Sequence, residues 1–333
     1  MLKIKKPGLL SSIQDLGRYG FQKHGVIASG VMDPLAHRIS NLLVGNDENE
    51  PTIEITLLGP VMEFTETTLI SICGANMNAT IDGQPAPLWR TILIKKGSEL
   101  RIGQSRQGCR AYIAIAGGIN VPSIMNSKST YLRAAIGGYQ GRALKAEDEL
   151  QPGKIGSISK KIIQALTPLL DNTPFTEMEW TVASELISIH HKKPFIRVTA
   201  GRQYDLFSKD SLHNFFNKSF NISSQSDRMG YRLEGPKLEL QNEEEMISEA
   251  VSFGTIQVPS NGNPIILLAD RQTTGGYPKI AQIVTVDLPY VAQLKPGDRI
   301  AFKEITVKES QKLYLEQEWN LQQLKQGIAL KLR

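Results

Sequence analysis

Short runs of β-branched and apolar residues, separated by turn-forming residues, recur along almost the whole chain. They come about every ten residues, a spacing typical of β-barrels and sandwiches rather than of alternating β-α units. We expect strands at residues 52–57, 68–73, 91–95, 110–116, 195–199, 219–223, 264–269, 283–287 and 299–303. The Asp82-Gly83 and Asn261-Gly262 pairs suit tight hairpin turns. The sequence therefore predicts a mainly β fold.

Helices are few, and local signals mark them. Asp33 can cap a helix that Pro34 begins, with apolar residues at helical spacing up to Gly45. Further helices are predicted at 204–217, 288–294 and 310–326. The last is polar, so we expect it to dock on a surface.

Two pairs of similar segments, in the same order in the two halves of the chain, indicate two similar β domains. Residues 58–64 resemble 234–240, and residues 96–102 resemble 295–300. Between them lies a weakly periodic stretch containing prolines. We expect a first β domain with an N-terminal helix at 1–155, a connection at 156–193, a second β domain at 194–305 and a C-terminal helix at 306–333.

Composition restricts the class of protein. The 333 residues carry a net charge of +5, and the basic residues come in scattered pairs, so nucleic-acid binding is not supported. Cys73 and Cys109 cannot form a disulfide framework and have apolar neighbours, so we expect two buried thiols in a reducing compartment. The longest apolar stretches, 111–121 and 264–269, are shorter than the ~20 residues that span a bilayer. We therefore expect a cytoplasmic protein without a membrane segment.

Two N-terminal-half segments are dense in polar residues and glycine. The first holds Asp15 and Arg18, which can pair, and then Ser29-Gly30 leading to the helix start at Asp33. A helix N-terminus can bind an anion, although a capped helix after an ordinary loop explains the pattern equally well. The second, residues 133–142, has arginines around a glycine-rich turn. Solvated arginines on a tight turn are the favoured interpretation there.

Two more such segments lie in the C-terminal half. One is Ser226-Asp227-Arg228, and the other follows the apolar strand at 264–269 and begins with Asp270 and Arg271. A strand that leads into a loop with charged, amide and hydroxyl groups is a common way to display a site. Tight-turn architecture remains an alternative, and Asp270 can instead pair with Arg271 or Arg228 in a structural network.

Several catalytic and cofactor motifs are missing from the sequence. It has no G-x-S-x-G elbow, H-E-x-x-H motif or phosphate-binding P-loop. His24 and His37 can act as bases, but surface or hydrogen-bonded histidines are more usual. We expect no metal site. Neither an ATP-grasp glycine loop nor a Met-Lys-Met biotin turn is present, so ATP and biotin would have to come from another chain.

The motifs resemble a known family, the biotin-dependent carboxyltransferases, also called allophanate hydrolase subunit two. The likeness covers residues 1–305 and is strongest to the 5-oxoprolinase subunits of that family. The sequence departs from the family pattern in two places: residues 126–130 read Asn-Ser-Lys-Ser-Thr where Gly-Ser-Arg-Ser-Thr is usual, and residues 146–148 read Ala-Glu-Asp where a glycine usually precedes Asp148. These changes weaken any binding role for Lys128 or the Asp148 turn. The residues that carry the likeness are 13–20, 29–33, 41–46, 226–230, 256–259, 270–277, 293 and 296–298.

The resemblance implies a fold, partners and a reaction. The fold is two cyclophilin-like β-barrel domains. The partners are two further 5-oxoprolinase subunits, one KipI-like and one of the LamB/YcsF type, and the reaction is ATP-dependent opening of 5-oxoproline, a small cyclic amide, to L-glutamate. Two other functions stay open. One is regulatory binding that relieves a KipI-like inhibitor of a sporulation kinase, and the other is biotin-dependent carboxyl transfer to urea or a similar amide.

Guanidinium and hydroxyl groups can steady phosphoryl charge, and a carboxylate can position protons. Residues of these types in the matching motifs become the candidate catalytic groups Asp270, Arg271 and Arg228. The candidate substrate-binding residues are Thr273, Thr274, Gly275, Gly276, Tyr277, Gln257, Ser226, Asp227, Asp15, Arg18, Ser29 and Asp33.

Overall fold

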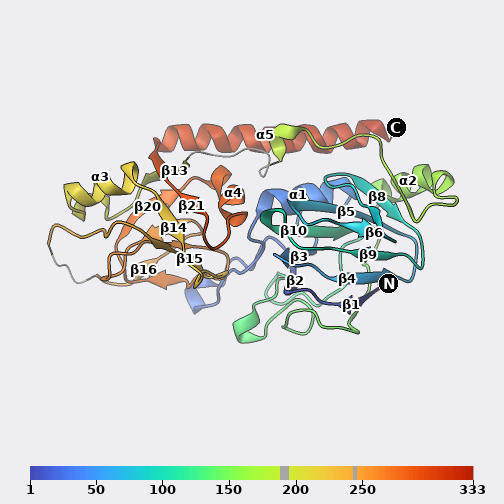
Figure 1. Cartoon of the computed structure of the whole chain (residues 1–333), viewed down its shortest axis with the longest axis horizontal. Helices are drawn as coiled ribbons and strands as arrows, with labels where there is room; N and C mark the ends of the chain where they lie inside the picture. Colours follow the sequence, from blue (N-terminus) through green and yellow to red (C-terminus); the bar gives the residue numbers. More distant parts are fainter. Residues whose placement is uncertain (188–194, 243–245, 333) are drawn as a thin grey trace. The chain divides into compact units, whose positions relative to one another are not determined.

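The structure, a computed structural model, describes residues 1–187, 195–242 and 246–332 (Figure 1). The chain divides into two compact units. Unit 1 consists of Met1–Arg18, Asp33–His191 and Trp319–Arg333, and unit 2 of Tyr19–Met32 and Lys192–Glu318. Both are built mainly from strands, which confirms the predicted fold class. The expected end of the connection, at residue 193, lies outside the described residues.

Unit 1 contains two six-stranded sheets that enclose one core. The first has the order β11 (Glu149–Leu150), β1 (Leu2–Lys6), β4 (Val61–Phe64), β9 (Glu99–Arg101), β6 (Thr80–Ile81) and β7 (Gln84–Pro85). The second has the order β12 (Phe175–Glu177), β8 (Thr91–Ile94), β5 (Thr68–Asn76), β10 (Gln107–Ile115), β3 (Thr52–Thr56) and β2 (Leu10–Gln14). Asp82 and Gly83 have φ of 48° and 82° in the β6–β7 turn, as the Asp-Gly pair predicts.

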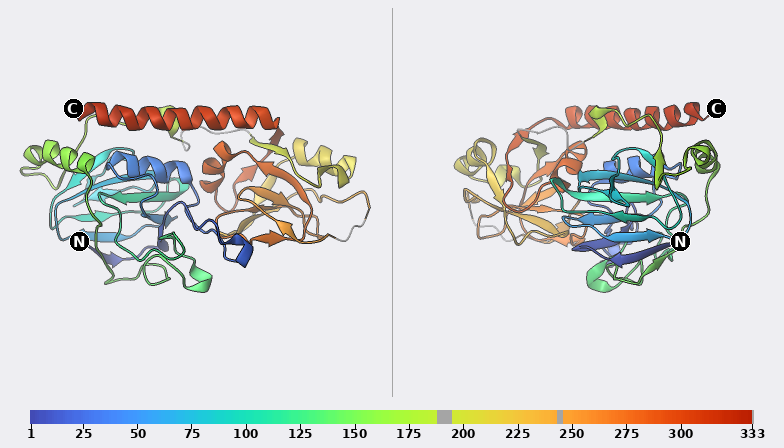
Figure 2. Two further views of the ribbon diagram at one scale, coloured as in Figure 1. Left: turned by 180° about the vertical axis from the view of Figure 1, so that it is seen from behind. Right: turned by 45° about the vertical axis from the view of Figure 1, so that its right-hand side comes forward.

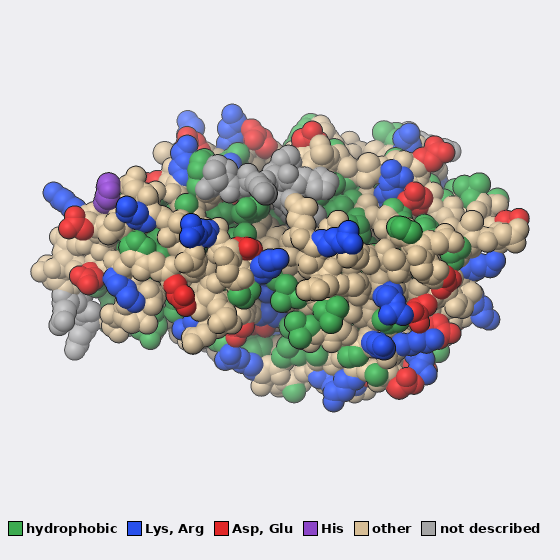
Figure 3. Space-filling view, in the orientation of Figure 1, with side chains coloured by type: hydrophobic (Ala, Val, Ile, Leu, Met, Phe, Trp, Pro, Cys, Tyr) green, Lys and Arg blue, Asp and Glu red, His purple; other side chains and the backbone are tan. Residues whose placement is uncertain are grey.

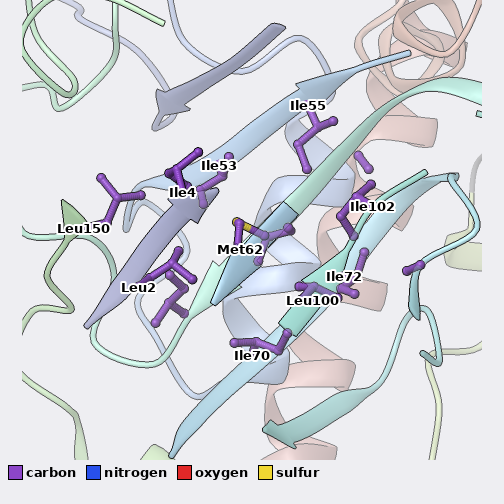
Figure 4. Packing of buried hydrophobic residues seen from close by; sticks show 14 of the residues in the cluster. Leu2, Ile4, Ile53, Ile55, Met62, Ile70, Ile72, Leu100, Ile102 and Leu150 are labelled. Atoms are coloured by element: carbon purple, nitrogen blue, oxygen red, sulfur yellow. The ribbon is translucent and has the colours of Figure 1, made fainter. Parts of the chain in front are cut away.

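Strand alternation separates the two faces of the second sheet. Ile113 and Ile115 of β10 point into the core between the sheets, together with residues such as Ile4, Met62 and Ile72 (Figure 4). Ala114 of β10 points the other way, into a second cluster with Val44. Helix α1 (Pro34–Leu43) packs on this outer face, against β5 and β10 (Figure 2). Both faces of the sheet are therefore covered, and polar side chains on the outer face are buried.

Unit 2 contains an eight-stranded sheet that closes on itself. Its order is β21 (Arg299–Ile300), β14 (Phe220–Ile222), β15 (Gly230–Glu234), β18 (Ile265–Leu267), β17 (Thr255–Gln257), β20 (Lys279–Ile283), β13 (Ile196–Ala200) and β22 (Phe302–Glu304). The two end strands, β21 and β22, are separated in the chain only by Ala301, so the sheet must curve round to a barrel. A separate ribbon pairs β16 (Glu249–Ala250) with β19 (Thr274–Gly275).

The core of unit 2 contains an aromatic cluster and takes one residue from the N-terminal part of the chain. Phe215 stacks on Phe302 with ring centroids 4.5 Å apart, and Phe220 packs beside them. Met32, fully buried, joins this cluster. The segment Tyr19–Met32 thus completes a unit whose other residues come much later in the sequence.

The predicted helices are present, with changed limits. Asp33 accepts from the Ala36 amide at 2.9 Å and caps α1, as predicted. The 204–217 helix is interrupted, because Ser208 caps a new helix there. The remaining helices are α2 (Ser157–Leu166), α3 (Lys209–Asn217), α4 (Leu288–Ala292) and α5 (Val307–Lys331).

Two predictions of local structure are wrong. The stretch expected as a strand at 283–287 is the end of β20 followed by a 3-10 turn. There the Asp287 amide donates to the Val284 carbonyl at 2.9 Å and closes the turn, while its buried carboxylate accepts from the Arg197 amide and guanidinium. Helix α2 was missed within the expected connection, where Ile162 and Leu166 bury one side of it.

Candidate functional site

A buried ion pair forms the centre of the candidate site in unit 2. Arg228 precedes β15 and Asp270 follows β18, and these two strands are paired. The Asp270 amide donates to the Arg228 carbonyl at 2.9 Å, so the backbone itself holds the two residues together. The Arg228 guanidinium donates Nε to Asp270 Oδ2 at 2.9 Å and Nη2 to Oδ1 at 3.1 Å. The sequence left open whether Asp270 pairs with Arg271 or Arg228, and the structure shows Arg228.

The N-terminal segment supplies two further contacts to this pair. Ser29 Oγ donates to Asp270 Oδ1 at 2.7 Å, and Arg228 Nη2 donates to the Gly30 carbonyl at 2.5 Å. Ser29 has a left-handed φ of 54° and Gly30 a φ of 92°. Serine is strained in this region, and such strain concentrates at functional sites. Three residues predicted from separate motifs, Ser29, Arg228 and Asp270, are therefore brought together.

The loop after Asp270 carries a second guanidinium in a different setting. Arg271 lies over the Phe253 ring at 5.7 Å, and its Nη1 donates to the Leu268 carbonyl at 3.2 Å. Burial lowers the pKa of Arg271, partly opposed by Tyr19. Its Nε is buried without an acceptor, and no carboxylate in the described ranges pairs with it. A desolvated guanidinium without a counter-charge favours binding of an anion.

The rest of that loop runs along the β16–β19 ribbon. The Thr273 carbonyl accepts from the Val251 amide at 3.2 Å, and Thr274 is exposed. Gly275 lies against the buried side-chain oxygen of Gln257, where a Cβ would come within 2.8 Å of that atom. A larger residue at this position would therefore displace the Gln257 side chain. Tyr277, further along, is 47% exposed.

The other predicted residues of this unit shape the turn before β15. Asp227 Oδ1 accepts from the Met229 amide at 2.8 Å, and Ser226 Oγ accepts from the Arg232 amide at 3.1 Å. These bonds fix the backbone on both sides of Arg228. Their visible role is to hold the turn that presents that guanidinium.

Asp15 and Arg18 belong to a cluster in unit 1. The Asp15 carboxylate accepts from Ser127 Oγ at 2.8 Å, the Lys128 amide at 2.6 Å and Ser129 Oγ at 2.5 Å. Arg18, fully buried, donates to the carbonyls of Ile124 and Ser129. Burial lowers the pKa of Arg18, and the negative charge of Asp15 partly opposes this. The cluster ties the loop around residue 127 to the end of β2. The predicted site residues thus fall into two groups, one in each unit.

Asp33 belongs to a row of buried, hydrogen-bonded polar residues that the sequence analysis missed, namely Asp33, Tyr112 and Glu54. Its amide donates to Tyr112 Oη at 2.8 Å, and Tyr112 Oη donates to Glu54 Oε2 at 2.8 Å. Burial raises the pKa of Tyr112, and the charges of Glu54 and Asp33 add to this. Arg110, also buried, lies on the same face of β10. Charged residues at the middle of otherwise apolar strands, such as Glu54 between Ile53 and Ile55, were the available signal.

His37 lies beside this row and is neutral at physiological pH. Its ring Nδ1 is 2.9 Å from Thr52 Oγ1, and the side chain is fully buried. Burial lowers its pKa to about 4, opposed in part by Asp15. His37 is therefore a hydrogen-bonded core histidine rather than an accessible base. Across the described residues, no group of three or more His, Cys, Asp or Glu side chains has an arrangement that could hold a metal ion.

Comparisons with known proteins identify relatives over nearly the whole chain. A family model for the carboxyltransferase domain, subdomain A and B, matches residues 24–304. The chain is 38% identical over 324 residues to the C subunit of 5-oxoprolinase from Escherichia coli, covering 97% of each. It is 36% identical over 318 residues to the Haemophilus influenzae protein of that name, covering 96% of each. It also superposes on the urea carboxylase of Kluyveromyces lactis with a TM-score of 0.85 and 29% identity, covering 98% of this chain and 29% of the other.

Surface features add two observations. On the face in Figure 3, basic and acidic side chains are interspersed. Within the described ranges, each helix is too short or too polar to cross a membrane.

Proposed function

Because the chain belongs to the carboxyltransferase domain family, subdomain A and B, we propose that it is one component of an ATP-dependent 5-oxoprolinase. The enzyme would open 5-oxoproline to L-glutamate in the cytoplasm, together with a KipI-like subunit and a LamB/YcsF-type subunit. The observation that supports this most strongly is the 36–38% identity to 5-oxoprolinase C subunits along nearly the full length of both proteins.

The reaction needs an activated amide. Resonance protects the ring amide of 5-oxoproline from water. ATP, when bound, would supply a phosphoryl group to the amide oxygen, which makes the amide carbon a better electrophile for water. We assign ATP to a partner subunit or to a site shared with one, and biotin to no part of this chain. The group in this chain that fits phosphoryl or carboxylate oxygens best is Arg271, whose guanidinium is desolvated and has no carboxylate partner among the described residues.

The Arg228–Asp270 pair has a different role in this proposal. Both carboxylate oxygens of Asp270 accept from Arg228, and one also accepts from Ser29, so the carboxylate is held in one orientation. A carboxylate fixed in a bidentate pair can orient the groups around it.

Substrate-facing roles for the neighbouring loop follow from its chemistry. Thr273 and Thr274 carry hydroxyls, and Gly275 and Gly276 allow close backbone approach beside Gln257 and Tyr277. We propose these as substrate-binding residues, with Ser226 and Asp227 supporting Arg228 from the turn. Within unit 1, Asp15 and Arg18 are proposed to anchor the end of β2, and Asp33 the start of α1.

The experiment is a rate measurement on the purified complex carrying Asp270→Asn or Arg271→Met. We expect each to lower the ATP-dependent rate of 5-oxoproline loss at least tenfold. The matched control is Asp287→Asn, which weakens the Arg197–Asp287 ion pair of unit 2, outside the site. Loss of rate in the two site variants but not in the control supports the proposal. Unchanged rates in folded complexes of both site variants contradict the site, and equal loss in all three indicates a stability effect only.

A second function, biotin-dependent carboxyl transfer to urea or a similar amide, is favoured by one observation. The chain superposes on a urea carboxylase with a TM-score of 0.85. Under that alternative, a biotinylated protein would co-purify with the chain, and the activity would depend on bicarbonate and urea. Retention on streptavidin of the chain from its native source distinguishes the two.

A further inference from the structure

A cavity of about 540 Å³ lies in unit 1, away from every residue assigned above. One wall is formed by Leu88 and Trp89, just before β8. The segment after β12 contributes Thr181, Val182, Ala183, Ser184 and Ile187 to the lining. This volume is within the range of small-molecule sites in proteins.

The backbone of Trp89 is in an unfavourable conformation. Its φ is 59°, in the left-handed region, which a bulky aromatic residue rarely adopts. The surrounding chain imposes it. The Trp89 amide donates to the Ile72 carbonyl at 2.8 Å, and the Trp89 carbonyl accepts from Thr181 Oγ1 at 3.2 Å and the Val182 amide at 3.4 Å. Two other lining residues, Thr181 and Val182, therefore hold the backbone of Trp89 in place.

The side chain of Trp89 has a second unfavourable feature. It is only 3% exposed, and its indole N–H has no acceptor in the described part of the chain. Buried donors are normally paired, and each exception calls for an explanation. Backbone strain of this kind clusters at active sites and ligand clamps, and an unpaired buried donor calls for a partner.

The cavity lining indicates the class of ligand. The described lining residues carry no charge: they are apolar, such as Leu88, Val182 and Ile187, or neutral and polar, such as Asn76 and Thr181. A charged ligand would lose its hydration there without a counter-charge. An indole N–H can only donate, so the ligand must present an acceptor.

We propose that this cavity binds a compact, uncharged, mainly apolar ligand whose carbonyl oxygen accepts a hydrogen bond from the Trp89 indole N–H. The N–H lies within the wall, so the indole ring must turn toward the ligand on binding. The site does not depend on the proposed function, because none of its residues takes part in it.

The test uses NMR of the full-length, ¹⁵N-labelled chain, whose three tryptophans each give one indole N–H resonance. The probe is acetophenone, with ethylbenzene as a probe without an acceptor and benzoate as a charged one. We expect acetophenone to shift the Trp89 indole resonance saturably and to leave that of Trp319 unchanged. Trp89→Phe, followed through the Val182 amide, should weaken binding about threefold to tenfold. Trp180→Phe and Trp319→Phe complete the assignment.

A cavity-filling variant checks the location. Ala183 is an exposed residue of the lining with a φ of −60°, so Ala183→Phe should fold, and it should abolish the shift. Ser184→Phe is the second variant if the first does not fold. Absence of a saturable shift with acetophenone overturns the proposal, as does unchanged binding by the filled variant. Equal affinity for ethylbenzene or benzoate contradicts the assigned hydrogen bond or the assigned neutrality.

Discussion

The contact between Ser29 and Asp270 makes the most specific prediction about the unit 2 site. Ser29→Ala removes a 2.7 Å hydrogen bond to a carboxylate. Bonds to charged groups contribute about 1.5–3 kcal/mol. Asp270 Oδ1 keeps its bond from Arg228, so no buried acceptor is orphaned and the loss should be near 1.5–2 kcal/mol.

Ser29→Gly separates this bond from the backbone strain. It removes the same hydroxyl but relieves a left-handed φ that costs a non-glycine residue about 1–2 kcal/mol. Glycine also has more conformational freedom in the unfolded chain, and this entropy lowers the free energy of unfolding by about 0.5–1 kcal/mol. The free energy of unfolding should therefore fall by less in Ser29→Gly than in Ser29→Ala, by roughly 0.5–1 kcal/mol.

Urea denaturation, with hydrogen exchange of the peptide spanning β18, is the assay. With a denaturant slope of about 2 kcal/mol/M, the Ser29→Ala midpoint should fall by about 1 M and that of Ser29→Gly by about half as much. If Ser29→Gly is as unstable as Ser29→Ala, or less stable, the strained backbone is not relieved and the reasoning fails. If Ser29→Ala has the stability of the wild type, the hydroxyl contributes nothing and the reasoning fails at its first step.

Three further predictions concern unit 1. Asp15→Asn should lower the free energy of unfolding by about 2–4 kcal/mol, measured by urea titration, because the amide replaces a carboxylate that accepts from two hydroxyls and two amides. His37 has a folded pKa of about 4 against 6.5 unfolded, so unfolding takes up a proton between these values. Stability should fall as pH drops from 6.5 to 4, by at most about 3 kcal/mol, and His37→Gln should lose this dependence in thermal scans. Gly138→Ala should destabilise by more than about 2 kcal/mol in the same scans, because φ is 52° and the new Cβ would lie 1.8 Å from Thr130 Oγ1; a folded variant of wild-type stability would contradict this.

Local signals predicted the elements whose causes are local. Asp33 and Pro34 begin α1 because the cap and the proline act within one turn, and Asp82-Gly83 makes its hairpin for a similar reason. The strand expected at 283–287 was wrong because Asp287 is engaged by Arg197, ninety residues away in the chain. No local pattern contains that information.

In the candidate site, too, the local features could be predicted from the sequence, whereas the contacts between distant segments could not. The residue types in the loops around Arg228 and Asp270 pointed to a site, but their pairing depends on the registration of β15 with β18. That Ser29 completes the pair depends on the N-terminal segment belonging to unit 2, a contact across 241 positions. Glu54 and Tyr112 were passed over because each stands within an apolar strand, and only the alternation of faces shows that they are buried beside α1.

The most direct test of the proposed function is ATP-dependent loss of 5-oxoproline in lysate from a strain that lacks this chain. The rate should be lost with the chain and restored when the purified protein is added back, with L-glutamate formed in equal amount. A rate in the deletion lysate equal to that of the parent strain would contradict the assignment of this chain to a 5-oxoprolinase.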